Sequence, residues 1–481
     1  MNVLFVASEA APFAKTGGLA DVLGSLPAAI AALGHDVRVV IPRYSRINLK
    51  TFRLKHAAAL QVPLGAWKEH CDIFESALTK QVTTYFVDKP IFFDRPELYG
   101  TAKADYPDNA ERFIFFSRAV LELCEAVDFK PDIVHCNDWQ TGLVPLFLKK
   151  FYSDAPHLAA AKTIFTVHNL GYQGLFSHDD LRLTNLGGDV FTPEGIEFWG
   201  KINCLKAGLV YADSITTVSK TYSREIQTKE NGHGLDGVLK KRAKDLSGIV
   251  NGIDFHEYDP MRDPALPKPF SATKLEGKTA CKSALRKTVG LPASSRPLIG
   301  MVTRLADQKG LDILCEALPE LMALGADLII LGTGDQKYHT ILTEAAQSYP
   351  DQLRVLLQYN DSLAKKIYAG CDLFLMPSLY EPCGLSQMIA FRYGAVPVVR
   401  KTGGLKDTVK NYQPKTGGGT GFLFEEYSAE ALVAALRRAL AAYASRTKWK
   451  RLMQNGMKQD FSWEHSAQEY VKLYRKMMRK K

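Results

Sequence analysis

Two short apolar runs at the start of the chain are separated by a stretch with the periodicity of a helix. Residues 3–8 (VLFVAS) are almost continuously apolar, which is typical of a strand buried on both faces. Apolar residues then recur at helical spacing, at Leu19, Val22, Leu23, Leu26, Ile30 and Leu33. Gly34 is expected to end this helix, and residues 35–42 (HDVRVVIP) form the next apolar run. The pattern predicts a βαβ unit.

Similar apolar runs recur through the first half of the chain. They cover residues 131–138 (PDIVHCND), 162–169 (KTIFTVHN) and 213–219 (DSITTVS), and each ends in polar or small residues. Continuous apolar strands that alternate with amphipathic helices indicate a parallel, doubly wound α/β sheet. Ligands of such sheets bind at the carboxyl ends of the strands.

The pattern breaks and then starts again in the second half. Residues 254–296 are rich in proline and charge, which favours a linker or an irregular entry into a second domain. Four further strands are expected within residues 297–305 (PLIGMVTRL), 326–334 (ADLIILGTG), 371–378 (CDLFLMPS) and 395–401 (AVPVVRK). The second half is therefore also predicted to be α/β.

Chain length fits this division, because 481 residues exceed the usual limit of about 250 to 300 for one core. We expect two Rossmann-like domains, at 1–254 and 255–460, with the active site in the cleft between them. Residues 461–481 are expected to form a helix that offers Trp463, Tyr470, Leu473 and Tyr474 for packing. Periodicity does not indicate where this helix docks.

Composition excludes several classes of protein. No apolar run reaches the ~20 residues of a membrane helix, and the first run is too short for a signal peptide, so we expect a cytoplasmic protein without a membrane partner. The eight cysteines contain no CxxC pair, which argues against a disulfide framework or a zinc site. The net charge of +10 is dispersed rather than gathered in a stripe, which argues against a nucleic-acid partner. A phosphorylated small substrate accounts for an excess of positive charge equally well, and so does solubility alone.

One five-residue phrase, KTGGL, occurs at residues 15–19 and again at 401–405. The first copy precedes a helix, where free N–H groups and the helix dipole favour a phosphate. It matches neither the GxGxxG nor the Walker pattern, so neither a nicotinamide dehydrogenase nor a P-loop NTPase is indicated. The second copy ends a strand and has no long helix behind it. Both loops are expected to need backbone conformations that only glycine adopts.

Other motifs place charged groups just beyond strand ends. Arg304 and Lys309 follow an apolar run, where they could converge on a diphosphate, although an ordinary solvated charge pair explains them equally well. Glu381, in EPCGL, is expected at the start of a helix whose N–H groups, together with a carboxylate, suit sugar hydroxyls. Asp138 and His168 also follow strands, and a single residue of either type there is more often structural.

Taken together, KTGGLADV, HCNDWQTGL, FTVHNLGYQG, TTVSKTYSREI, NGID, TRLADQKG, YEPCGLSQMIA and the second KTGGL resemble the bacterial glycogen synthases and their starch synthase relatives that use ADP-glucose. The resemblance runs in order through the chain to FSWEHSA at 461–467. It implies a GT-B fold and transfer of glucose from ADP-glucose to the non-reducing end of an α-1,4-glucan such as glycogen, with retention at the anomeric carbon.

The same resemblance implies the roles of particular residues. Lys15, Gly17 and Gly18 are expected to contact the donor phosphates, and Arg304 and Lys309 to hold the distal phosphate. Catalytic roles are expected for Arg304 and Lys309 at that phosphate, for Asp138 and His168 near the reacting carbon, and for Glu381 on the glucose ring. Tyr359 is expected to pack on adenine. Further substrate contacts are expected from Tyr99, Asn251, Cys383, Gly384, Leu385, Thr402 and Gly403.

Some relatives carry a second glutamate eight residues after the first, where this chain has Ile389. No nucleophile is evident, so we expect a front-face route in which the departing phosphate accepts the proton of the acceptor. We expect no metal and no cofactor, because basic residues can replace Mg²⁺ at the diphosphate. Open alternatives are a related GT-B enzyme that uses UDP-glucose and a catalytically silent glucan-binding protein, whereas the sequence makes no case for a phosphorylase.

Overall fold

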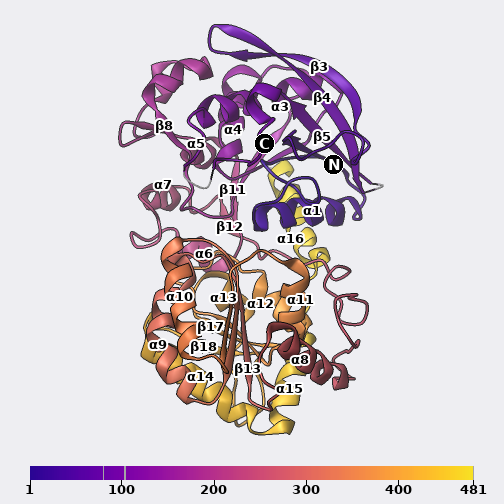
Figure 1. Cartoon of the computed structure of the whole chain (residues 1–481). Helices are drawn as coiled ribbons and strands as arrows, with labels where there is room; N and C mark the ends of the chain where they lie inside the picture. The colour runs from indigo at the N-terminus through magenta and orange to yellow at the C-terminus, as the bar shows by residue number, and fades with distance from the viewer. Residues whose placement is uncertain (80, 102–103, 480–481) are drawn as a thin grey trace. The chain divides into compact units, whose positions relative to one another are not determined.

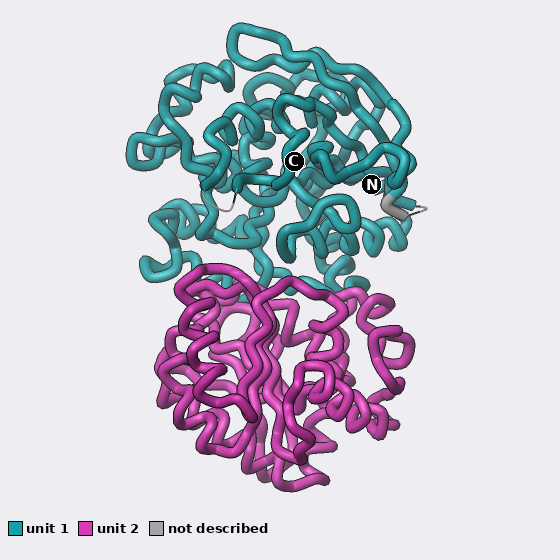
Figure 2. Tube along the Cα trace, viewed as in Figure 1, with its two compact units in different colours: residues 1–252, 463–481 teal, residues 253–462 magenta. Residues whose placement is uncertain are grey.

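The computed structural model describes the whole chain except residues 80, 102–103 and 480–481 (Figure 1). It divides into two compact units (Figure 2), of which unit 1 comprises Met1–Gly252 and Trp463–Lys481 and unit 2 comprises Ile253–Ser462. We propose that these units are the two domains expected from the sequence.

A nine-stranded sheet with the order β12-β11-β7-β6-β1-β2-β5-β4-β3 forms the centre of unit 1. Its strands are β1 (Asn2–Val6), β2 (Asp36–Pro42), β3 (Lys55–Leu64), β4 (Trp67–Thr79), β5 (Val82–Asp88), β6 (Ile133–Asn137), β7 (Lys162–Val167), β11 (Ser214–Thr217) and β12 (Leu246–Gly248). From β12 to β5 all neighbours are parallel, so their carboxyl ends lie along one edge. The predicted doubly wound parallel arrangement is confirmed for this part.

The remaining edge of the sheet differs from the expectation. Strand β4 pairs antiparallel with both β5 and β3. Strand β3 is largely solvent-exposed over its first half and alternates between buried and exposed residues in its second half. Half-exposed strands lack the continuous apolar run that identified the central ones, which explains why this hairpin was missed.

Helices and a small second sheet complete unit 1. The helices are α1 (Gly18–Ala31), α2 (Pro90–Phe93), α3 (Asn109–Ala126), α4 (Leu143–Phe151), α5 (Cys204–Tyr211), α6 (Lys220–Glu225), α7 (Asp236–Lys241) and α16 (Trp463–Arg479), with 3-10 turns η1 (Trp139–Thr141), η2 (His178–Thr184) and η3 (Gly188–Val190). The small antiparallel sheet contains β8 (Leu175–Ser177), β10 (Lys201–Asn203) and β9 (Glu197–Phe198), in that order.

The C-terminal helix α16 packs on unit 1. The hydroxyl of Tyr474 lies 2.7 Å from Nδ1 of His135 on β6, and the hydroxyl of Ser466 donates to the carbonyl of Val250 at 2.7 Å. Trp463, Tyr470 and Tyr474 are buried as expected, whereas Leu473 is only partly buried. These contacts locate the docking site that periodicity left open.

Unit 2 is built on a six-stranded parallel sheet with the order β15-β14-β13-β16-β17-β18. Its strands are β13 (Leu298–Val302), β14 (Asp327–Leu331), β15 (Leu353–Leu356), β16 (Leu373–Met376), β17 (Val396–Arg400) and β18 (Phe422–Phe424). Its helices are α8 (Glu276–Val289), α9 (Leu311–Ala323), α10 (Gln336–Ser348), α11 (Asp361–Gly370), α12 (Ser386–Arg392), α13 (Gly403–Thr408), α14 (Ala429–Tyr443) and α15 (Arg446–Met457), with the 3-10 turn η4 (Asp307–Lys309). The four strands predicted for this half are confirmed.

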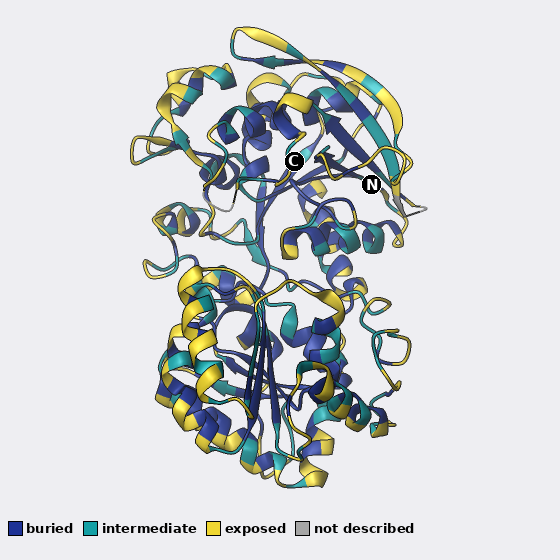
Figure 3. Cartoon of the chain, viewed as in Figure 1, coloured by how far each residue is buried: buried dark blue, intermediate teal, exposed yellow. Residues whose placement is uncertain are grey.

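The strands of unit 2 are largely buried, and its helices turn exposed faces to solvent (Figure 3). Burial of both sheet faces follows from the apolar runs of the central strands. Within the described residues, no helix is long and apolar enough to cross a membrane.

Candidate active site

Asp138 and His168 lie side by side at the carboxyl edge of the unit 1 sheet. They follow the neighbouring strands β6 and β7, and Oδ1 of Asp138 accepts a hydrogen bond of 2.7 Å from the backbone N–H of His168. Asp138 has a φ of +58°, which is uncommon outside glycine and is found at strained functional positions. The structure thus places side by side the two residues that the family resemblance assigns to the same part of the site.

Burial sets the charge of both side chains. Burial raises the pKa of Asp138 to about 7, although N–H groups of His168 and Asn169 oppose this rise. Burial lowers the pKa of His168 to about 3, so its imidazole is neutral at physiological pH. Nε2 of His168 lies 3.0 Å from Oδ1 of Asn137, whose amide nitrogen donates to two backbone carbonyls. The proton therefore sits on Nε2, and Nδ1 is the acceptor of the ring.

Glu9 is a buried carboxyl group that the sequence reasoning missed. Only 4% of the residue is exposed, and its carboxylate accepts hydrogen bonds from the backbone N–H of Thr16 at 2.5 Å and from the Thr16 hydroxyl at 3.0 Å. Burial raises the pKa of Glu9 to about 7. Glu9 lies three residues beyond the end of β1, whereas Asp138 directly follows β6, so its place after a strand was only a weak signal. It anchors the first KTGGL loop.

The first KTGGL loop leads directly into α1. Nζ of Lys15 lies 2.6 Å from Oδ1 of Asp21, in the first turn of that helix. Gly17 has an extended backbone with φ −157°, and a Cβ there would meet no atom within 4 Å. Gly18 is the first helical residue. The expectation that this loop needs a conformation reserved for glycine is therefore wrong for Gly17, which instead leaves open space beside a helix N-terminus.

Two other expected contacts lie in unit 1. Asn251 follows β12 and is 5% exposed, and its Oδ1 has no hydrogen-bond partner among the described residues. A buried amide oxygen without a partner is suited to accept a hydrogen bond from a ligand. The hydroxyl of Tyr99 lies 2.7 Å from that of Ser8, and its ring packs against Phe113. Tyr99 is thus held beside Glu9 and is partly a local core residue.

In unit 2, the expected site residues follow strands at the carboxyl edge of the sheet. Nζ of Lys309, in η4, lies 3.0 and 2.8 Å from the two carboxylate oxygens of Glu381. The hydroxyl of Ser378 also donates to Glu381 at 2.9 Å. Arg304, two residues beyond β13, is exposed, and Tyr359, beyond β15, is 72% exposed. Lys309 is therefore held by a carboxylate in this structure.

Glu381 belongs to a loop and not to a helix terminus, because α12 begins only at Ser386. This corrects its expected place. The loop turns at Gly384, whose φ is +72°, while Cys383 is buried and Leu385 caps the helix. Only 6% of Glu381 is exposed.

The second KTGGL packs directly against the backbone of the Glu381 loop. The N–H of Gly404 donates to the carbonyl of Glu381 at 3.0 Å. Gly403 has φ +42°, and a Cβ there would lie 1.9 Å from the same carbonyl oxygen. The expected need for glycine is thus met in this copy. Thr402 is buried, and Nζ of Lys401 lies 2.5 Å from Oε1 of Glu425.

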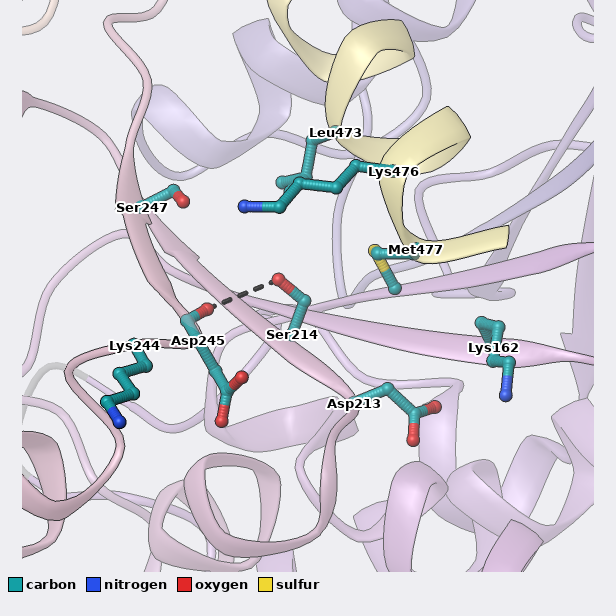
Figure 4. Close-up of a pocket in the computed structure, with 9 residues that line it drawn as sticks. All are labelled: Lys162, Asp213, Ser214, Lys244, Asp245, Ser247, Leu473, Lys476 and Met477. Carbon is teal, nitrogen blue, oxygen red and sulfur yellow. Dashed lines mark hydrogen bonds between the residues drawn. The ribbon is translucent and has the colours of Figure 1, made fainter. Parts of the chain in front are cut away.

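A cavity of about 180 Å³ opens at the opposite edge of the unit 1 sheet (Figure 4). It is lined by the starts of β7 and β11 and by the end of α16. Lys476 extends its amine toward Ser247, while Lys162 points away. His168 follows the other end of β7, so this cavity is separate from the candidate active site.

Comparison with known proteins gives matches over both units. Residues 2–241 match the family model described as "Starch synthase catalytic domain", and residues 286–456 match "Glycosyl transferases group 1". The chain is 50% identical over 478 residues to a glycogen synthase of Syntrophotalea carbinolica, covering 99% of each chain. It is 48% identical to glycogen synthase 2 of Geobacter sulfurreducens, covering 99% of this chain and 98% of that protein.

Solved structures agree with these matches. The catalytic domain of starch synthase IV from Arabidopsis thaliana, solved with ADP and acarbose, has a TM-score of 0.92 and 36% identity, with 99% of each chain covered. A sucrose-phosphate synthase of Thermosynechococcus elongatus has a TM-score of 0.63 at 19% identity, covering 99% of this chain and 98% of that one. The predicted GT-B architecture of two Rossmann-like domains is confirmed.

Proposed function

The chain belongs to the glycogen synthase and starch synthase family of glycosyltransferases, and on this premise we propose that it transfers glucose from ADP-glucose to the non-reducing end of an α-1,4-glucan. The observation that carries the proposal is 50% identity to a glycogen synthase over essentially the full length of both chains. The ADP in the related starch synthase structure supports an adenine nucleotide as the leaving group.

Each unit by itself carries cations and backbone N–H groups that suit the donor diphosphate. Lys15 and the open N-terminus of α1 at Gly17 and Gly18 offer one group of donors. Arg304 and Lys309 offer a second group. Lys309 carries Glu381 as its partner before the donor arrives, and a phosphate oxygen then shares or replaces that partner.

The glucose ring and the base are bound by the remaining groups. Glu381 and the backbone from Cys383 to Leu385 bind sugar hydroxyls, and the unpartnered Oδ1 of Asn251 accepts one more. The exposed ring of Tyr359 stacks on adenine. The remaining contacts of the donor are expected from Thr402 and Gly403.

The reaction retains the anomeric configuration. The bond between C1 and the phosphate oxygen breaks, the acceptor hydroxyl oxygen bonds to C1 on the same face, and its proton passes to the departing phosphate. Lys309 and Arg304 offset the negative charge that develops on that phosphate. His168 and Asp138 act near C1, where a neutral imidazole can hydrogen-bond the sugar without repelling the positive charge that develops there.

Release of ADP tests the proposal directly. The purified chain is incubated with glycogen and either ADP-glucose or UDP-glucose, and nucleotide release is measured in a coupled assay. We expect ADP release that depends on glycogen, and α-1,4 linkages in the extended product by NMR. Nucleotide release from UDP-glucose alone would show that UDP-glucose, and not ADP-glucose, is the donor. Glycogen binding without nucleotide release from either donor would indicate a catalytically silent glucan-binding protein.

A further inference from the structure

Trp199 stands at the tip of a tight hairpin and is 85% exposed. Strand β9 ends at Phe198 and β10 begins at Lys201, which pairs with Phe198, so the turn has two residues. Both have positive φ, +53° at Trp199 and +75° at Gly200. An indole ring is thus presented to solvent on a defined turn.

Turn chemistry does not account for a tryptophan here. Two-residue hairpins with positive φ at both positions favour Asn–Gly, because asparagine and glycine tolerate the left-handed region. A bulky residue with positive φ is an outlier, and such strain persists where the surroundings enforce it and often serves function. Because the indole ring is exposed, the folded state also lacks the stabilisation that burial of this apolar surface would give. The residue therefore works against the stability of its own turn.

The turn lies beside the loop that contains His233 and Gly234. A Cβ at Gly234, whose φ is +81°, would lie 2.8 Å from the ring of Phe198 and 3.9 Å from Nε1 of Trp199, so the glycine makes room for both side chains. The carbonyl of His233 accepts from Nε2 of Gln173 at 3.0 Å. The hairpin therefore packs against the loop that contains Gly234, and a hydrogen bond joins this loop to Gln173.

The hairpin and this loop are connected to the carboxyl edge of the unit 1 sheet, where Asp138 and His168 lie. Gln173 lies five residues after His168, and its Oε1 accepts from Nδ2 of Asn203 on β10 at 2.6 Å. Strand β10 also pairs with β8 (labelled in Figure 1), where Phe176 packs on Trp139, the residue after Asp138. The hairpin that carries Trp199 is therefore connected, within unit 1, to the sheet edge that carries Asp138 and His168.

We propose that Trp199 is a stacking platform for a glucose unit of the α-glucan acceptor, at a subsite beyond the reacting end. The C–H face of a glucose ring is apolar and packs on the face of an aromatic ring, while its hydroxyls meet the surrounding polar groups. Glu197 and Lys201 flank the turn and offer such groups. The inference rests on the proposed function, because that function supplies the glucan.

Trp199→Asn tests the inference, because it restores the favoured Asn–Gly turn while removing the ring. We expect an unchanged or higher melting temperature, a rise of about tenfold in KM for glycogen, and faster migration in gels that contain glycogen. KM for ADP-glucose should change less than twofold. Trp199→Phe keeps an aromatic face and should remain close to the wild type in glycogen affinity.

Trp67→Ala is the matched control, because Trp67 is 71% exposed at the β3–β4 hairpin of the same unit. We expect it to behave like the wild type. Glycogen affinity of Trp199→Asn within twofold of the wild type, or an equal loss in Trp67→Ala, would overturn the inference. A wild type that releases no nucleotide would refute the proposed function instead, and gel migration would still test the platform.

Discussion

Nζ of Lys309 lies within 3.0 Å of both carboxylate oxygens of Glu381, in a pair that is largely removed from solvent. The cation expected at a phosphate and the carboxylate expected at the sugar thus neutralise each other across 72 residues of sequence. Removing one partner leaves the other buried without compensation, which generally costs about 3 to 5 kcal/mol. Binding of a diphosphate would supply a new partner for the lysine.

Glu381→Ala should lower kcat by about 100-fold or more and leave ADP affinity unchanged or tighter, because Lys309 loses its competing carboxylate. Coupled kinetics give kcat, and titration calorimetry gives the dissociation constant of ADP. Glu381→Gln is the matched variant, since its amide preserves the volume without the charge. A kcat near the wild-type value would remove Glu381 from the site.

The two KTGGL copies allow a test of what their glycines do. Gly17→Ala should leave the melting temperature within about 2 °C of the wild type and weaken donor binding, because its Cβ would enter open space at the helix N-terminus. Gly403→Ala should destabilise the fold by at least about 2 kcal/mol, because φ is +42° and its Cβ would clash with the Glu381 carbonyl.

Thermal unfolding and ADP-glucose titration of the two glycine variants separate these roles. Gly404→Val belongs with Gly403→Ala, because a Cβ at Gly404 would lie 2.0 Å from the carbonyl oxygen of Cys383. A large loss of stability in Gly17→Ala would show that the first copy also depends on glycine for packing.

The central strands were predictable because they are buried on both faces and therefore read as continuous apolar runs. The β3–β4 hairpin was not, since Trp67 and the start of β3 face solvent and give no such run. Periodicity identified a packing face on α16 but not its partner. The contact between His135 and Tyr474 joins positions 339 residues apart, and only tertiary structure brings them together.

The candidate site likewise has features that the sequence predicted and features that it did not. Asp138 and His168 are candidates because they are polar residues directly after apolar strands, and the family resemblance supplies their expected role. Glu9 lies three residues beyond β1, and nothing in a single sequence distinguishes a buried glutamate from a solvated one. The sequence does not predict the pairing of Lys309 with Glu381 either, because their motifs indicate contacts with separate parts of the donor. The sequence thus predicted which residues belong to the site, but it did not predict which of them contact one another.

Lys15 and Lys401 should differ in donor binding. Lys15→Ala should weaken ADP-glucose binding by about 1.5 to 3 kcal/mol, as for the loss of a charge-assisted hydrogen bond. Lys401→Ala should have a distinctly smaller effect, because its partner Glu425 is 73% exposed and α13 behind it has six residues. Asp21→Asn is a useful companion, since it removes a carboxylate from Lys15 and should not weaken donor binding. Equal losses in the two lysine variants would contradict the assignment.

Glu9 gives the protein a specific dependence of stability on pH. Burial raises the pKa of Glu9 from its ordinary value of 4.5 to about 7, so the folded state binds a proton that the unfolded state releases between these values. The free energy of unfolding therefore falls as pH rises from about 4.5 to about 7, by about 3 kcal/mol from this group. Glu9→Gln cannot ionise and keeps an oxygen that can accept from Thr16.

The measured quantity is the difference in unfolding free energy between the wild type and Glu9→Gln, from urea denaturation at several pH values between 4.5 and 8. His135 and His168, whose pKa values burial lowers to about 3, are present in both proteins, so their opposite pH dependence cancels in the difference. The wild type should lose stability relative to the variant across this range, because ionised Glu9 is desolvated. A difference that stays constant with pH would mean that the hydrogen bonds from Thr16 fully offset the cost of burying the charge.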